Sequence, residues 1–286
     1  MFELLILGEG FIGKYLAELL QKRQVSYAAT TTDGRNNTIK WKFPDSASDP
    51  VDCSGLPAAK SILITFPLQG SAPASRLIKA YLEMLQSKQS QSLSNPQWIY
   101  LGSTRPFKEI PSTRFTKPNI AAGGPRVEAE ELIINEYKGY VLNLAGLWGG
   151  ERIPQNWSRF YQDTQKLRGR LNDRSLHLIH GADVALAIAE VVGTKQPSGR
   201  WLVADGHTHD MLEILLREQR LRDMLQELLD ADAGVREMLG TDTVADVKLG
   251  ESKVKMRIDP SHSWTDYQIR PKYPYRIGQP DPFDHF

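Results

Sequence analysis

The sequence has 286 residues, of which 41% are hydrophobic and 24% are charged, and its formal net charge is +1. This length can bury a large core, as one large domain or as one domain with an appendage, and the near-zero charge gives no electrostatic reason to expect a nucleic-acid partner. A single cysteine, Cys53, excludes an internal disulfide framework, and no apolar run has the length of a membrane span. Because the first expected strand begins at residue 2, we expect no targeting segment and a cytoplasmic protein.

The N-terminal half of the chain alternates between strand-like and helix-like segments. The strand-like segments are apolar throughout, which is typical of strands that are buried on both faces of a sheet. We expect strands at 2–7, 25–30, 61–66, 97–101 and 139–144, and helices at 11–22, 73–86 and 125–137. Strands that alternate with helices in this way indicate a parallel sheet with helices on both faces.

The C-terminal half is less regular. We expect a loop with one helix at 145–175, and then, across 176–192, a short extended piece followed by a helix that Asp183 helps to start. Residues 199–206 have strand character, and 208–229 form an amphipathic helix whose Leu and Met stripe packs against the body. The last 27 residues, rich in proline and aromatic residues, are expected to form an extended tail on the surface.

The first expected strand leads directly into three glycines with the spacing G-x-G-x-x-G, within the segment LILGEGFIGKYLAELL at 4–19. Gly8 permits a tight turn, Gly10 lets phosphate oxygens approach the backbone, and Gly13 lets the helix pack close to the strand. The N-terminus of the following helix offers free N–H groups and the positive end of its dipole. The loop therefore predicts a dinucleotide site; a tight strand–helix turn without a ligand is the alternative.

The end of the second expected strand indicates which dinucleotide binds. An NAD site usually carries Asp or Glu there; Asp33 lies at a suitable distance from the loop, but several residues beyond the end of the strand. The hydroxyls of Thr30, Thr31 and Thr32, with the guanidinium of Arg35, suit a 2′-phosphate better, because Arg donates two hydrogen bonds to a phosphate. We therefore expect NADP in preference to NAD. The alternative is that these residues only form a solvated turn.

Five later segments, taken in order, resemble successive motifs of the short-chain dehydrogenase/reductase superfamily, in particular its extended and atypical branches. They are ILITFPLQG (62–70), WIYLGSTRPF (98–107), GPRVEAEELII (124–134), LNLAGLWGGER (142–152) and LHLIHGADVALAIAEVV (176–192). The resemblance covers about residues 1–210. It implies an α/β fold, a Rossmann-type doubly wound parallel sheet of six or seven strands with a smaller C-terminal substrate-side lobe. Residues 1–146 would form the NAD(P)-binding core, and residues 147–286 would complete the sheet through about 176–206 and form the lobe and tail.

The same resemblance implies roles for residues that follow two of the strands. Thr65, Phe66 and Pro67 would line the cofactor channel, and Ser103 or Thr104 would assist catalysis by hydrogen-bonding the substrate oxygen; a turn cap is the alternative for this pair. We expect no metal site. The complete set of expected cofactor-binding residues is Gly8, Glu9, Gly10, Phe11, Ile12, Gly13, Thr30, Thr31, Thr32, Arg35, Thr65, Phe66, Pro67, Ser103 and Arg126.

The sequence departs from the superfamily at the motif that usually carries catalysis. Active branches use Tyr-x-x-x-Lys, where the Tyr is the general acid or base. The matching positions hold Ala122 or Gly123 in place of the Tyr, and Arg126 or Val127 in place of the Lys. An arginine stays protonated and is a poor acid–base catalyst, although Arg126 could anchor a ribose or a phosphate. Replacement donors are conceivable among Ser103, Thr104, Arg105, Lys108 and Glu109, none of which is singled out by its spacing.

The histidine-containing motifs are expected to be structural or solvated. His180 and Asp183 match a segment that usually serves packing and helix capping. His207 and His209 have a spacing that could bind a metal from a loop, but no third ligand stands at a recognisable spacing, so we expect solvated histidines.

These patterns leave two functions open. The first is an NADP-dependent oxidoreductase, or an epimerase-like enzyme, that acts on an unknown small molecule without the Tyr-x-x-x-Lys pair. The second is a dinucleotide-binding sensor or scaffold without turnover, which the missing pair favours. A third interpretation, a dehydrogenase with an all-helical second domain, is disfavoured by the strand-like segment near residue 200. The resemblance also implies that the protein could form a homodimer.

Overall fold

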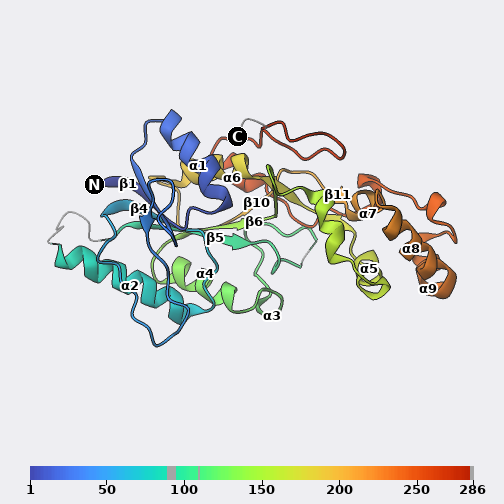
Figure 1. The fold of residues 1–286 in the computed structure, drawn as a ribbon, viewed down its shortest axis with the longest axis horizontal. Helices are drawn as coiled ribbons and strands as arrows, with labels where there is room; N and C mark the ends of the chain where they lie inside the picture. Colours follow the sequence, from blue (N-terminus) through green and yellow to red (C-terminus); the bar gives the residue numbers. More distant parts are fainter. Residues whose placement is uncertain (89–94, 109, 284–286) are drawn as a thin grey trace.

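The computed structural model describes residues 1–88, 95–108 and 110–283, and these contain a seven-stranded, fully parallel sheet (Figure 1). The strand order is β10-β6-β5-β4-β1-β2-β3. The strands are β1 (Phe2–Leu7), β2 (Tyr27–Thr31), β3 (Ile39–Lys40), β4 (Ala59–Ile64), β5 (Gln97–Ser103), β6 (Tyr140–Leu144) and β10 (Gly199–Val203). The order reverses direction between β1 and β4, as in a Rossmann-type fold. The expected α/β fold class is therefore confirmed.

Helices cover both faces of this sheet. On one face lie α1 (Phe11–Lys22) and α6 (Gly181–Val191), and on the other lie α2 (Ser71–Ser87) and α4 (Pro125–Asn135), which follows the single-turn helix α3 (Ile120–Gly123). Successive side chains of a strand point to opposite faces. In β1, Leu4 and Ile6 accordingly join the core under α1 and α6, whereas Leu5 and Leu7 join the core under α2 and α4.

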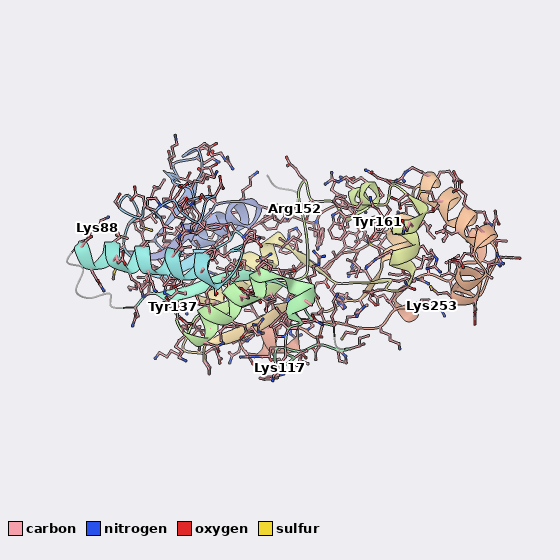
Figure 2. The ribbon with its side chains drawn as sticks, turned by 90° about the horizontal axis from the view of Figure 1, so that it is seen from below. Lys88, Lys117, Tyr137, Arg152, Tyr161 and Lys253 are labelled. Carbon is pink, nitrogen blue, oxygen red and sulfur yellow. The ribbon has the colours of Figure 1, made fainter. Side chains whose placement is uncertain are left out.

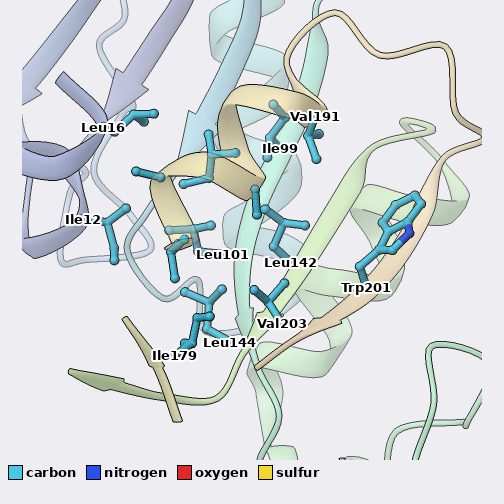
Figure 3. Packing of buried hydrophobic residues seen from close by; sticks show 14 of the residues in the cluster. Ile12, Leu16, Ile99, Leu101, Leu142, Leu144, Ile179, Val191, Trp201 and Val203 are labelled. Atoms are coloured by element: carbon cyan, nitrogen blue, oxygen red, sulfur yellow. The ribbon is translucent and has the colours of Figure 1, made fainter. Parts of the chain in front are cut away.

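Figure 3 shows how the core beneath α1 and α6 is built. Ile12 and Leu16 of α1 belong to the same buried cluster as the sheet residues Leu101, Leu142 and Val203. Removing a buried Leu from such a core costs about 2–5 kcal/mol. This packing fixes the start of α1, and therefore the glycine loop before it, at the edge of the sheet.

The remaining elements form a smaller lobe beside the carboxyl edge of the sheet and the connections to it (Figure 1). Its core is made of leucines from α5, α7 and α8, such as Leu167, Leu212 and Leu225. The elements are β7 (Gly146–Trp148), the 3-10 helix η1 (Pro154–Phe160), α5 (Thr164–Leu171), β8 (Ser175–Leu176), β9 (Leu178–His180), β11 (His209–Asp210), α7 (Met211–Leu215), α8 (Gln219–Ala231), α9 (Ala233–Leu239), η2 (Val244–Asp246), η3 (Glu251–Lys253) and α10 (Ser261–Thr265). The expected boundary at residue 146 stays a prediction. In the described part of the chain, no helix has both the length and the apolar character needed to cross a membrane.

The prediction of a single helix at 208–229 is wrong, because the chain forms β11, α7 and α8 there. Asp210 starts α7 by accepting a hydrogen bond from the Leu212 N–H, and Glu218 is extended between the two helices. The leucine stripe continues across this break into the same core, so the apolar pattern alone does not reveal it.

The C-terminal tail also differs from the expectation of a surface segment. Trp264 and Tyr267 are buried in the main core, and Tyr275 is buried beside Trp148. Asp183 accepts N–H groups from the tail and does not cap α6. The His180 side chain caps this helix instead, by accepting a hydrogen bond from the Ala182 N–H. The tail is therefore an integral part of the fold.

Candidate functional site

A cavity of about 850 Å³ opens at the carboxyl ends of β1, β2, β4, β5 and β6. This is the edge at which open parallel sheets of this kind bind ligands, and the volume is within the range of pockets for small molecules and cofactors. The cavity brings together most of the residues that the sequence singled out. Those that line it are Gly8, Glu9, Gly10, Phe11, Ile12, Thr31, Thr32, Arg35, Thr65, Phe66, Pro67, Ser103 and Arg126.

The glycine loop is held from below by two threonines. The Gly8 N–H donates to Thr30 Oγ1 at 2.9 Å, and Thr65 Oγ1 donates to the Gly8 carbonyl at 2.5 Å. Gly8 has a φ of +94°, and a Cβ on it would lie 2.7 Å from Thr65 Oγ1. Gly8 is therefore required both by its backbone conformation and by the close approach of Thr65, and Thr30 supports the loop instead of lining the main cavity.

The first turn of α1 points an uncapped N-terminus at this cavity. Gly10 occupies the N-cap position, no side chain caps the helix, and no acidic residue lies in its first turn. A Cβ on Gly10 would meet no heavy atom within 4 Å, so the space above the backbone is open. Free N–H groups and the helix dipole together favour an anion at this point.

Gly13 plays a different part from the one expected. A Cβ there would overlap the Cγ atom of Glu9 and not the neighbouring strand. The half-buried Glu9 side chain thus folds back over the first turn of α1. Burial raises the pKa of the Glu9 carboxyl, and the positive charge of Arg35 opposes that rise.

The polar side chains at the end of β2 divide into supporting and cavity-facing groups. Thr31 Oγ1 accepts from the Gly34 N–H at 2.9 Å and lies 2.6 Å from Thr38 Oγ1, so its hydroxyl holds the turn. Thr32 and Arg35 are exposed and line the cavity. Arg35 also forms an exposed ion pair with Asp33 at 3.0 Å, and the hydrogen bond from Arg35 lowers the pKa of Asp33.

A second hollow of about 460 Å³ adjoins the main cavity and shares Thr31, Thr32 and Phe66 with it. Its wall is aromatic: Trp41 and Phe43 follow β3, and the Phe43 ring stacks on the Phe66 ring at 5.8 Å. Sequence reasoning missed this hollow. The available signal was the pair of aromatic residues two positions apart, directly after a short strand.

The two catalytic candidates at the end of β5 face different ways. Ser103 lines the cavity, and its Oγ accepts from the Arg105 N–H at 3.2 Å. Thr104 is not part of the lining, since its N–H and its hydroxyl both donate to the Leu144 carbonyl, at 3.0 and 3.3 Å. Of the other conceivable donors, Arg105 and Lys108 do not line the cavity, and Glu109 lies outside the described residues.

The positions that match Tyr-x-x-x-Lys lie on α3 and α4. A Cβ on Gly123 would come within 2.5 Å of Pro106 Cγ, so this stretch packs closely against the loop after β5. Arg126 lines the cavity, donates to the Leu101 carbonyl and lies with its guanidinium 5.7 Å from the Tyr100 ring. Among the described residues, neither a tyrosine nor a lysine lines the cavity.

A buried ionic network, which sequence reasoning also missed, lies beneath the cavity floor. Glu130 Oε2 accepts from Asn143 Nδ2 and from the Arg200 guanidinium, both at 2.9 Å, and all three side chains are buried. Asn143 Nδ2 also donates to the Ser103 carbonyl at 3.0 Å. A Cβ on Gly102, which lines the cavity, would lie 2.5 Å from Glu130 Oε1. The network thus fixes the backbone that carries Ser103.

The side of the cavity near the smaller lobe is built by the segment 151–159, which sequence reasoning did not single out. This segment contributes Arg152, Asn156, Trp157 and Arg159 to the lining. With Arg35 and Arg126, four arginines line the cavity against two glutamates, one of which is Glu151. The lining therefore favours an anionic ligand.

The histidine motifs serve the structure. His180 is fully buried and caps α6, and Asp183 accepts N–H groups from the C-terminal tail. The expectation of two solvated histidines is wrong for His209, which is buried with its Nε2 3.4 Å from Asp205 Oδ2, whereas the His207 side chain is half exposed. Within the described part of the chain, no group of three or more potential ligands could hold a metal ion.

Comparison with known proteins supports the fold. No protein-family model and no curated protein sequence matches the chain. Solved structures do match: UDP-N-acetylglucosamine 4-epimerase from Bacillus cereus has a TM-score of 0.58 and 13% identity, with 95% of this chain and 93% of that chain covered. MoeE5 in complex with UDP-glucose and NAD has a TM-score of 0.62 and 13% identity, with 96% and 95% covered. The chain has the fold of these proteins.

A dTDP-glucose 4,6-dehydratase from Bacillus anthracis, in complex with NAD, is similar over the same extent. Its TM-score is 0.54 at 12% identity, with 96% of this chain and 93% of that chain covered. The likeness therefore includes the smaller lobe as well as the sheet. It confirms the Rossmann-type architecture that the resemblance to short-chain dehydrogenases/reductases implied.

Proposed function

We propose that this protein binds a nicotinamide dinucleotide, with NADP(H) preferred over NAD(H), and acts as an oxidoreductase or epimerase-like enzyme on a small molecule. The observation that carries the proposal is the uncapped N-terminus of α1. It faces a cavity of about 850 Å³, and no side chain fills the space next to Gly10 at this helix start. The matching structures of MoeE5 and of the dTDP-glucose 4,6-dehydratase contain NAD, which supports a nicotinamide dinucleotide as the ligand.

The residues present fit such a ligand in two parts. The backbone at Gly10 and the first turn of α1 would hold the pyrophosphate by hydrogen bonds and by the helix dipole. The aromatic hollow at Trp41, Phe43 and Phe66 would hold the adenine, since flat aromatic walls stack on a base. Arg35, which lines the main cavity, would then pair with a 2′-phosphate.

The other end of the cavity would receive the nicotinamide and the substrate. When bound, the dinucleotide supplies a hydride donor or acceptor. Ser103 would hydrogen-bond the substrate oxygen from the carboxyl end of β5, and Arg126 would anchor a ribose or a phosphate with its permanent charge. Proton transfer would then rest on Ser103, on the carboxyl of Glu151, or on water, because the described lining holds no tyrosine.

A second function, a dinucleotide-binding sensor or scaffold without turnover, is favoured by the missing Tyr and Lys. The backbone at Gly123 packs within van der Waals distance of Pro106 and leaves no room for a side chain. Binding of a dinucleotide without turnover would then be the activity of the protein.

Titration of the purified protein with NADPH and NADH tests the proposal, with tryptophan fluorescence or heat of binding as the signal. We expect micromolar binding of NADPH and clearly weaker binding of NADH. Binding of neither dinucleotide would overturn the proposal. Turnover of NADPH across a panel of carbonyl compounds then separates the two functions, since tight binding without turnover favours the sensor.

A further inference from the structure

The C-terminal segment, residues 266–283, starts beside the edge strand β10, passes Trp148 and ends at the edge of the dinucleotide cavity. Figure 1 shows it ending beside α1 and α6. Asp183 of α6 anchors it by accepting N–H groups from Lys272 at 2.7 Å and from Tyr273 at 3.0 Å. Near its end, the Phe283 ring lies 5.2 Å from the ring of Tyr15 in α1. The segment is thus held against the first helix of the fold.

Asp281 makes the last polar contacts of this segment. Its Oδ2 accepts the Gly150 N–H at 2.6 Å, and its Oδ1 lies 3.1 Å from Nε2 of the fully buried His180. His180 Nδ1 accepts a hydrogen bond from the Ala182 N–H. Nε2 therefore carries the hydrogen of the neutral ring and donates a hydrogen bond to Asp281. Burial opposes ionisation of Asp281, but hydrogen bonds from Phe283, Gly150 and His180 together lower its pKa.

Gly150 belongs to a tight turn, residues 149–152, that forms part of the cavity rim. Two backbone hydrogen bonds between Gly149 and Arg152, at 3.1 and 3.0 Å, close the turn. Gly149 has a φ of +116°, and a Cβ on it would overlap the His180 ring and lie 2.8 Å from Tyr15 Oη. The turn is therefore pressed between α1 and α6, and Asp281 supplies a polar clamp on it.

This turn carries Arg152 over the start of α1. The Arg152 guanidinium lies 4.3 Å from the ring centroid of Phe11, the first residue of the helix, and both residues line the cavity. Figure 2 shows Arg152 between the sheet and the lobe that carries Tyr161. In the described parts of the chain, Arg152 forms no ion pair with a carboxylate. Its charge is thus available to an anion at the N-terminus of α1.

We propose that Asp281 is a positioning residue of the dinucleotide site. It fixes the 149–152 turn, so that Arg152 lies over Phe11 and adds a positive charge where the pyrophosphate binds. The C-terminal segment thereby controls affinity for the dinucleotide through a residue that does not itself line the cavity. This inference rests on the proposed binding of a dinucleotide.

The test is a double-mutant cycle on NADPH affinity with the full-length protein. The variants are Arg152→Ala, Asp281→Ala and the double variant, with Asp281→Asn as a conservative change that keeps one acceptor oxygen. Asp259→Ala is the matched control, since Asp259 also accepts a backbone N–H in the C-terminal region, but the donor is Ser261 and not a residue of the 149–152 turn. Each Kd is measured at low and at high salt, because a cation close to the phosphates makes binding salt-dependent.

We expect Arg152→Ala and Asp281→Ala each to weaken NADPH binding about 10-fold. The double variant should bind NADPH no more weakly than Arg152→Ala alone, and the Kd of both single variants should depend less on salt than that of the wild type. Asp281→Asn should retain part of the affinity for NADPH. Asp259→Ala should bind NADPH as the wild type does. Additive losses, or an Asp281→Ala loss with unchanged salt dependence, would overturn the inference while dinucleotide binding stands. Failure of the wild type to bind NADPH would instead overturn the proposed function and the inference together.

Discussion

Replacement of Gly10 by valine separates the role of the glycine loop in binding from its role in folding. The φ of Gly10 is −89°, outside the left-handed region, and a Cβ there would meet no heavy atom within 4 Å. The fold should therefore tolerate the side chain, but the isopropyl group would occupy the open space above the first turn of α1. Loss of two charge-assisted hydrogen bonds to phosphate, at about 1.5–3 kcal/mol each, corresponds to a rise in Kd of about 10²–10⁴-fold.

Gly8→Ala is the matched comparison, because it should lower the stability of the fold, whereas Gly10→Val should lower the affinity for the dinucleotide. Its φ of +94° strains any L-residue, and the new Cβ would lie 2.7 Å from Thr65 Oγ1, which itself holds the Gly8 carbonyl. The strain should cost about 1–3 kcal/mol, which lowers the Tm by roughly 2–12 °C for a chain of this size.

The assay pairs a thermal melt of the ligand-free protein with an NADPH titration for each variant. We expect Gly10→Val to melt with the wild type and to bind NADPH at least about 100-fold more weakly, and Gly8→Ala to melt several degrees lower. Wild-type NADPH affinity in a folded Gly10→Val protein would refute the reasoning, since it would mean that the loop is only a turn.

Three further predictions concern charged groups. Arg35→Ala should raise the Kd of NADPH about 10-fold or more while that of NADH changes little, and equal losses in the two titrations would exclude a 2′-phosphate role. Glu130→Ala should lower the free energy of unfolding in urea by about 1–3 kcal/mol, because it leaves buried Arg200 with only the partly exposed Glu131 as its ion-pair partner, and a loss below about 0.5 kcal/mol would contradict this. Burial raises the pKa of Asp183 to about 6, above its unfolded value of about 3.9, so the folded chain holds the extra proton between these two values. The Asp183 contribution to stability should therefore be largest below about pH 4 and be lost as the pH rises through about 6, so that Asp183→Asn removes this component from the pH dependence of unfolding measured by urea titration; an unchanged slope would refute it.

The sheet could be predicted from the sequence because its signals are local. The long strands contain short apolar runs, and the helices α1 and α2 between them are amphipathic, so these elements can be recognised within short windows. The tight turn at Gly8 is local too, since three glycines directly after a strand leave few other conformations. For the same reason, the sequence correctly predicts that the loop residues from Gly8 to Ile12 line the cavity.

The parts that could not be predicted depend on contacts between residues far apart in the chain. Thr30 looks like a ligand-binding hydroxyl in sequence, but the hydrogen bond that it accepts from the Gly8 N–H, 22 positions away, shows that it supports the backbone. The buried pair Glu130 and Arg200 is separated by 70 positions, and each residue alone reads as a surface charge. No local pattern distinguishes such pairs from solvated side chains.

The Tyr-x-x-x-Lys pair would fall either on Ala122 and Arg126 or on Gly123 and Val127, and no single substitution restores it in either place. At Gly123, a side chain of any size would overlap Val127 and meet Pro106, so a tyrosine at that position requires the loop after β5 to move. In the other placement, which pairs Ala122 with Arg126, Arg126 donates to the Leu101 carbonyl, and its guanidinium cannot give up a proton at neutral pH. A change of either residue alone would therefore not restore the usual chemistry. Turnover by this protein consequently requires proton transfer by a different group, for which Ser103 and Glu151, both in the cavity wall, are the first two residues to replace.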